Sequence, residues 1–148
     1  MRARFVNEVF SFERSTSDPL KNLSIGKRAQ IIKWLDSFEI KNYTINDDLT
    51  IDVKGDVNLF ERSLTCFPSF IKFNEVTGHF TCSYNQLTSL EGCPRTVGLS
   101  LYCSYNQLTS LEGCPRTVGD SFVCYYNKKQ FIEEDVRSLC KVKGGISI

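Results

Sequence analysis

Cysteine is the residue type whose spacing first suggests chemistry, because five of the seven cysteines recur at fixed positions. Cys82, Cys103 and Cys124 follow one another at intervals of 21 residues, and Cys93 and Cys114 share a second position, each before a proline. Thiols at regular spacing could bind a metal, form disulfides or attack a substrate. Free cysteine also packs as a small apolar residue and is among the most frequently buried types. The odd count and an intracellular setting favour buried, reduced thiols.

A metal site is the alternative use of these thiols, and its ligands would be His79, Cys82 and Cys103. These three residues lack the paired C-x-x-C spacing that marks structural zinc. We therefore expect neither a metal nor a cofactor, and we expect all seven cysteines to be free.

Catalytic chemistry has little support elsewhere in the chain. The single histidine removes the commonest general base from almost every position. The sequence contains no phosphate-binding loop, no G-x-S-x-G and no paired catalytic carboxylates. Cys66 and Cys140, which lie outside the recurring positions, fall in a variant repeat and in an expected helix. The chain is expected not to be an enzyme.

The cysteine spacing belongs to a longer repeat that must position these side chains. Residues 82–98 recur letter for letter at 103–119, and an eroded third copy starts with Cys124-Tyr125-Tyr126-Asn127. Self-similarity at this period indicates a solenoid, in which each copy forms one coil that buries its apolar side against its neighbours.

Within one coil, Leu101 and Cys103 alternate with polar residues, which is the period of a strand with one buried face. The pattern L-x-C-x-x-N-x-L-x-x-L, completed by Leu108 and Leu111, is that of a leucine-rich repeat. It predicts an α+β fold with a parallel β-sheet on the concave face. The prolines Pro94 and Pro115 favour an extended convex return.

Two polar positions of the coil have expected structural roles. One asparagine recurs per coil, at Asn85, Asn106 and Asn127, and the likeness to leucine-rich repeats implies that it satisfies backbone groups that the turn after the strand leaves unpaired. Gly98 and Gly119, just before the strands, are expected at sharp corners with positive φ.

The concave face should carry the function, because residues 21 apart form columns across adjacent strands. One column consists of Tyr84, Tyr105 and Tyr126. The candidate partner-binding residues are Thr81, Ser83, Tyr84, Tyr102, Ser104, Tyr105, Tyr125 and Tyr126. Tyrosine is enriched at recognition sites because it combines contact area with a hydrogen-bonding tip. The other interpretation is a mutually stacked ladder that only stabilises the sheet, and the sequence leaves both open.

The flanks of the repeat are expected to cover its ends, which divides the chain into an N-terminal helical cap (1–48), the solenoid (49–128) and a C-terminal cap (129–148). An apolar cluster of Phe5, Val9, Phe10 and Phe12 precedes a short helix opened by Asp18-Pro19.

Ile31, Trp34, Leu35 and Phe38 predict a stronger helix over about 27–38, with Trp34 packed on the first coil. The neighbouring basic pair Lys27-Arg28 could contact an acidic partner.

The segments next to the repeat also have predicted structures. Residues 49–53 and 57–59 alternate as strands and are expected to form a hairpin. The first coil, offset by 23 residues, has Arg62 where later coils have asparagine. Residues 131–140 predict a C-terminal helix, and residues 146–148 predict a last short strand.

Charge and hydropathy limit the kinds of partner. The 18 basic and 17 acidic residues give no broad field for nucleic acid or an anionic membrane. The N-terminus lacks the apolar core of a signal peptide. We expect a soluble, cytoplasmic protein.

The whole chain resembles small leucine-rich-repeat proteins encoded by bacteriophages. The resemblance lies in segments 12–20 (Phe-Glu-Arg-Ser-Thr-Ser-Asp-Pro-Leu), 43–53, 82–119 and 133–144. It implies a non-catalytic protein-binding module in the host cytoplasm, directed at a host enzyme or defence component.

Two other functions remain open. One is a small-molecule or nucleotide site on the tyrosine column, although few basic residues accompany it. The other is an effector of the leucine-rich-repeat ligase kind, although no segment here supplies a ligase domain.

Overall fold

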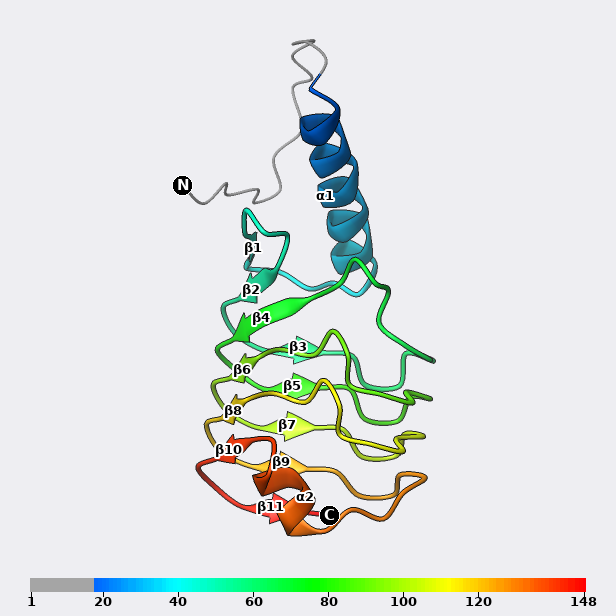
Figure 1. Cartoon of the computed structure of the whole chain (residues 1–148), viewed down its shortest axis with the longest axis vertical. Helices are drawn as coiled ribbons and strands as arrows, with labels where there is room; N and C mark the ends of the chain where they lie inside the picture. The colour runs from blue at the N-terminus through cyan, green and yellow to red at the C-terminus, as the bar shows by residue number, and fades with distance from the viewer. Residues whose placement is uncertain (1–17) are drawn as a thin grey trace.

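The computed structural model describes residues 18–148, which form one helix followed by a solenoid of about four turns (Figure 1). The helix stands at the N-terminal end of the stack and extends away from it, and the chain then winds down through two sheets of short strands to the C-terminus. The repeat thus builds a solenoid, as predicted. The apolar cluster expected at Phe5, Val9, Phe10 and Phe12 lies outside the described residues.

The solenoid has two sheets rather than one. The first sheet contains, in spatial order, β1 (Tyr43–Ile45), β2 (Ile51–Val53), β4 (Phe73–Val76), β6 (Thr96–Val97), β8 (Thr117–Val118) and β10 (Lys141–Val142). The second contains β11 (Ile146–Ser147), β9 (Phe122–Val123), β7 (Leu101–Tyr102), β5 (Phe80–Thr81) and β3 (Val57–Asn58). The sequence predicted the strands of the second sheet and, within residues 49–53, β2 of the first, whereas β4, β6 and β8 lie in what was expected to be a return without a sheet.

Neighbouring coils pair in parallel and in the register that the repeat dictates. Val57 lies opposite Phe80, and Phe80 lies opposite Leu101, so the first offset is 23 residues and the next is 21. The core forms a column between the sheets. Its fully buried members include Phe80, Cys82, Val97, Leu101, Cys103, Val118 and Phe122.

The expected hairpin between residues 49–53 and 57–59 is wrong. β2 pairs antiparallel with β1 and parallel with β4, while β3 pairs with β5 in the second sheet. Residues 54–56 therefore form a corner that carries the chain from one sheet to the other. Pairing with the next coil satisfies backbone amide and carbonyl groups of both β2 and β3. A hairpin between the two strands would prevent this pairing.

Gly98 and Gly119 do not have positive φ, contrary to expectation. The glycines that do are Gly55, Gly92 and Gly113. Gly98 is needed for close approach, because a Cβ atom there would collide with the Thr77 carbonyl oxygen of the preceding corner. A Cβ at Gly119 would meet the Gly98 carbonyl oxygen in the same way. Direct stacking of backbone on backbone therefore selects glycine at this corner.

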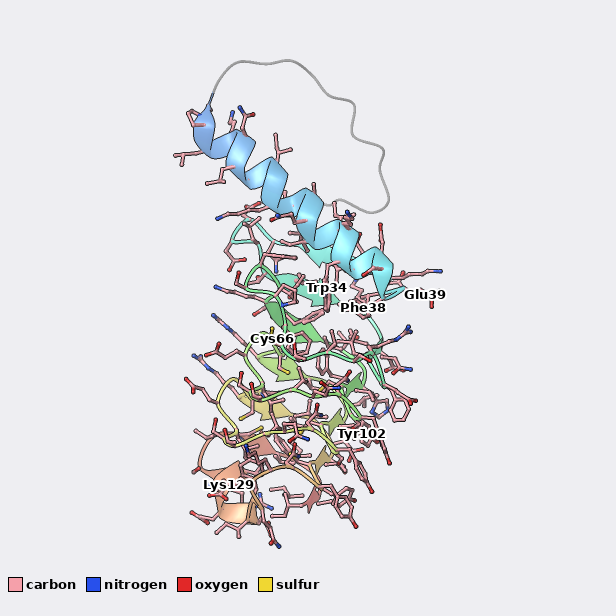
Figure 2. All side chains as sticks on the ribbon, turned by 90° about the vertical axis from the view of Figure 1, so that its right-hand side faces the viewer. Trp34, Phe38, Glu39, Cys66, Tyr102 and Lys129 are labelled. Atoms are coloured by element: carbon pink, nitrogen blue, oxygen red, sulfur yellow. The ribbon has the colours of Figure 1, made fainter. Side chains whose placement is uncertain are left out.

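The two predicted N-terminal helices are one helix, α1 (Pro19–Ser37). The Asp18 carboxylate caps it by accepting a hydrogen bond from the Leu20 amide, and Pro19 occupies its first turn. Ile31 and Leu35 are fully buried. Trp34 packs between the helix and the first coils, with its ring 6.3 Å from Phe67 and 6.4 Å from Phe73 (Figure 2). The predicted position of Trp34 is confirmed.

The side chain of Arg28, a residue of α1, is buried against the solenoid. It therefore does not form an exposed basic pair with Lys27. Its Nη1 donates to the Ile45 carbonyl and its Nη2 to the Asn46 carbonyl, both at 3.1 Å. Asp47 lies 4.0 Å from the same guanidinium group. This cation ties the helix to the turn after β1.

The C-terminal segment continues both sheets. α2 (Glu133–Arg137) is shorter than the predicted helix over 131–140, and the Asp135 carboxylate accepts a hydrogen bond from the Ile132 amide at its start. β10 pairs with β8, and β11 pairs with β9, so the predicted last strand is present. Across the described residues, neither helix has the length and apolar character needed to cross a membrane.

Candidate recognition surface

Four aromatic rings from successive coils stand in one row, which we call the aromatic ladder: Phe60, Tyr84, Tyr105 and Tyr126. The Tyr84 and Tyr105 rings stack with centroids 4.3 Å apart and planes 17° apart. Tyr105 and Tyr126 stack at 4.6 Å and 25°. Phe60 joins the other end, 5.0 Å from Tyr84 and tilted by 54°.

The turn that leaves the second sheet positions the tyrosines. Tyr84, Tyr105 and Tyr126 all have left-handed backbone conformations, with φ of 58°, 56° and 52°. The Tyr84 amide donates to the Ser104 carbonyl, and the Tyr105 amide donates to the Tyr125 carbonyl. Since coils stack at the strand spacing of about 4.8 Å, this turn places each ring over the next at stacking distance.

The asparagine next to each tyrosine holds the turn as predicted. The Asn106 side-chain oxygen accepts from the Leu87 amide, and its Nδ2 donates to the Cys82 and Cys103 carbonyls. Asn85 bonds the Arg62 and Leu64 amides and the Leu59 carbonyl. Each asparagine thus serves the coil before its own, so the missing asparagine at Arg62 leaves no gap there.

The ladder faces solvent along its length. Tyr84, Tyr105 and Tyr126 are 47%, 40% and 71% exposed. Because the ring faces cover one another, the surface they present consists of ring edges and hydroxyls. A hydrogen bond to the Tyr84 hydroxyl raises the pKa of Tyr105 above its ordinary value. Tyr105 therefore stays a neutral donor and acceptor across the physiological range.

The other candidate residues divide into surface and interior positions. Tyr125 is exposed, with its ring 6.5 Å from Tyr126. Tyr102 and Thr81 are half-buried, and Tyr102 lies 5.9 Å from the His79 ring.

Ser83 and Ser104, which the alternation placed on the outer face, are buried. The Ser83 hydroxyl accepts from the Ser104 amide, and the Ser104 hydroxyl accepts from the Tyr125 amide. These two hydroxyls link successive coils inside the turn, because the backbone has already left the strand at these positions and directs the side chains inward. They are not exposed to a partner.

Sequence reasoning missed Phe60 and a hollow at the C-terminal end of the ladder. Phe60 occupies the position of Ser83 in the first coil, and the 23-residue offset was the signal that could have identified it. The hollow has a volume of about 420 Å³ and is lined by Cys124, Tyr125, Tyr126, Asn127, Lys129, Gln130, Phe131 and Ile148.

A second hollow, of about 450 Å³, lies on the return segments before the first sheet. Its lining includes the basic side chains of Lys72, Arg95 and Arg116. It shares no residue with the hollow beside Tyr126.

The cysteines lie mostly inside the coils. Cys66 is exposed, Cys114 is half-buried and the other five are buried, all without disulfide bonds. Burial raises the pKa of Cys114 to about 12 and that of Cys140 to about 11. A hydrogen bond with Cys124, together with burial, raises the pKa of Cys103. The buried thiols are therefore poor nucleophiles at neutral pH.

The alternative metal ligands, His79, Cys82 and Cys103, do not form a metal-binding cluster. Within residues 18–148, no group of three or more histidine, cysteine or acidic side chains is arranged to hold a metal ion. His79 Nδ1 instead accepts a hydrogen bond from the Ser100 amide at 3.2 Å, which links two corners.

Comparisons with protein-family models, with curated proteins and with solved structures find no match to this chain.

Proposed function

We propose that this chain is a non-catalytic protein-binding module whose partner docks on the aromatic ladder. The observation that carries the proposal is the row of Tyr84, Tyr105 and Tyr126, stacked at 4.3 and 4.6 Å and still 40% to 71% exposed. Exposed aromatic anchors contribute most of the binding energy at many protein interfaces.

Two features favour recognition over packing alone. The backbone at Tyr84 and Tyr105 is held by amide–carbonyl bonds and by the neighbouring asparagines, so the fold does not require a ring at these two positions. The stacked rings are also already ordered, which lowers the side-chain entropy that a partner's binding must overcome.

A nucleotide-binding function has weaker support. Bases bind by stacking on open aromatic faces, usually beside basic side chains that contact phosphate. In this ladder the ring faces of Tyr84 and Tyr105 are covered by their neighbours. The basic side chains of Arg95 and Arg116 line the separate hollow on the return segments.

We extend the proposal to the family and setting that the sequence resemblance implies. The coil pattern L-x-C-x-x-N-x-L-x-x-L favours the short-period leucine-rich repeat. On this proposal the protein is encoded by a bacteriophage, acts in the host cytoplasm and binds a host enzyme or defence component.

Affinity capture from a bacterial lysate tests the proposal, with the wild type, Tyr105→Ala and Arg116→Ala as parallel baits. Tyr105 lies between two rungs, so its loss should weaken the partner by about 1–3 kcal/mol, as truncation of an aromatic anchor does. Arg116→Ala, on the return segment, should retain the partner. Quantitative mass spectrometry would rank the captured proteins, and melting temperatures would control for folding.

The proposal requires a protein that wild type and Arg116→Ala capture and Tyr105→Ala loses. Equal capture by all three baits, or a loss only with Arg116→Ala, would assign binding to another surface and leave the ladder as packing.

A further inference from the structure

The aromatic ladder is closed at one end and open at the other. At its N-terminal end, Phe60 packs against Tyr84. At its C-terminal end, Tyr105 covers one face of Tyr126, and among the described residues no ring stacks on the other face. Tyr126 is accordingly the most exposed of the three stacked tyrosines, at 71%.

The open end coincides with the hollow of about 420 Å³. Tyr125, Tyr126 and Asn127 line it from the last turn of the ladder, and Phe131 and Ile148 line it from the chain that follows. That later chain lies toward the C-terminal end of the stack, in the direction in which a further rung would stand (Figure 1). The volume falls within the range of roughly 300–1,000 Å³ typical of ligand sites.

The lining gives the hollow a definite chemistry. Lys129 is its single charged side chain, at the position where Leu108 lies in the coil above. Its ammonium group is 5.4 Å from the ring centroid of Phe131, another lining residue, which is within cation–π distance. Tyr125, Tyr126 and Phe131 supply aromatic surface, and Gln130 adds an amide.

We propose that this hollow binds an aromatic side chain of the partner protein, flanked by a carboxylate, as the next rung of the ladder. The ring stacks on the free face of Tyr126, and the carboxylate pairs with Lys129. This inference rests on the proposed function and deepens it, because it names the chemistry of the segment that the ladder recognises. An acidic segment containing tyrosine or phenylalanine has both groups.

Small probes test the inference without the partner. The full chain is titrated with 4-hydroxyphenylacetate, which carries an aromatic ring and a carboxylate, and with cyclohexylacetate, which carries the carboxylate on a saturated ring. Aromatic NMR signals of Tyr126 report binding. We expect saturable shifts with 4-hydroxyphenylacetate, and weaker binding by cyclohexylacetate by about tenfold because it cannot stack.

Variants assign the two contacts. Tyr126→Phe should keep the probe, whereas Tyr126→Ala should weaken it by about tenfold. For Tyr126→Ala, the Tyr125 signals report binding. Lys129→Gln should weaken 4-hydroxyphenylacetate but not uncharged 4-methylphenol, and by only a few fold because the pair is exposed. Arg116→Ala is the matched control, and melting curves check the folding of each variant.

Several results would overturn the inference. These are equal binding of the aromatic and cyclohexyl probes, an affinity that Tyr126→Ala leaves unchanged, or no saturable shift at the Tyr126 signals of the wild type. Tighter binding of adenosine monophosphate than of 4-hydroxyphenylacetate at these signals would assign the hollow to a nucleotide instead.

The two proposals can fail separately. If probes bind at Tyr126 while Tyr105→Ala retains every captured protein, the proposed function fails and the hollow remains a binding site. If Tyr105→Ala loses a partner while no probe binds, the ladder is the interface and the hollow is not part of it.

Discussion

At the scale of the residue, buried polar side chains link the coils of this solenoid. The buried Asn106 side chain bonds backbone groups of its own coil and of the coil before it. The Ser104 amide donates to the Ser83 hydroxyl of the coil before, and the buried Ser104 hydroxyl accepts from the Tyr125 amide of the coil after. Buried backbone groups must be paired, and strands of only two residues leave many of them at the turns. Side chains that supply the missing partners therefore contribute to holding neighbouring coils together.

Removing one of these asparagines should be costly. Asn106→Ala leaves the Leu87 amide without its side-chain acceptor and removes one of the two amide bonds to the Cys82 carbonyl, which keeps the one from Asn85. We therefore expect a loss of about 1–3 kcal/mol in unfolding free energy. The adjacent exposed Gln107→Ala should change it by less than about 0.5 kcal/mol. Urea unfolding measures both, and equal effects of the two substitutions would contradict this role.

The cysteines should differ sharply in reactivity. Cys66 is exposed, whereas burial raises the pKa values of Cys114 and Cys140 to about 12 and 11. A thiol reagent should modify one cysteine quickly in the native protein, and Cys66→Ser should abolish that phase. All seven thiols should react after denaturation. A lower total, or stoichiometric zinc in native mass spectrometry, would refute the assignment of free thiols.

At the scale of the element, the corner between the two sheets leaves no room for a side chain at its glycine. The corner glycines Gly78, Gly98 and Gly119 lie directly against the backbone of the corner before them. The sequence showed that glycine recurs here but not why, because positive φ and close approach select the same residue.

A methyl group at the corner separates the two explanations. Gly98→Ala would press its Cβ into the Thr77 carbonyl, and we expect a loss of about 1–3 kcal/mol from overpacking. Gly145→Ala, in the last corner, has no heavy atom within 4 Å of the added Cβ and should be close to neutral. Thermal melts of Gly98→Ala and Gly145→Ala distinguish the two explanations. Equal melting temperatures would show that neighbouring corners can move apart without a loss of stability.

The C-terminal segment should behave as a cap. It supplies β10 and β11 and buries Phe131, Val136 and Cys140. Removing residues 131–148 would expose these contacts and the edges of β8 and β9, so the truncated protein should aggregate or lose its cooperative melt. Removing Ile148 alone should do neither. A monomeric truncated protein with an unchanged melting curve would show that the segment is dispensable.

At the scale of the whole molecule, the repeat made the solenoid predictable, because identical residues 21 apart must occupy equivalent places. The second sheet and the asparagine turns follow from that logic, whereas the position of Trp34 followed from the helical spacing of Ile31, Trp34 and Leu35. The first sheet does not, since Thr96 and Val97 are too few to show alternation. The burial of Arg28 was not predicted for a different reason. Its carbonyl partners Ile45 and Asn46 lie at the end of β1 and in the turn after it, which no periodicity in the sequence marks.

The candidate surface was predictable in part for a related reason. A residue that recurs every 21 positions forms a column whatever the details of the coil, so the row of Tyr84, Tyr105 and Tyr126 followed from the spacing alone. Which neighbours face outward depends on where the strand ends. Ser83 and Ser104 lie just past that end and turn inward, because strict alternation applies only within a strand.

The same repeat logic predicts what happens when one coil is removed. Deleting residues 82–102 joins Thr81 to Cys103, and because 103–119 copies 82–98, every later residue keeps its register. The shortened chain should fold without Tyr84 and Tyr102, so with one fewer ring in the aromatic ladder, and with a lower melting temperature, since each coil contacts only its neighbours.

Deleting 82–101, one residue fewer, leaves Tyr102 as an extra residue in the strand where Cys82 lay, and a one-residue slip turns inward side chains outward. Circular dichroism melts should therefore show the smaller deletion to be the more damaging. The reverse order would mean that the coils are held by composition rather than by register.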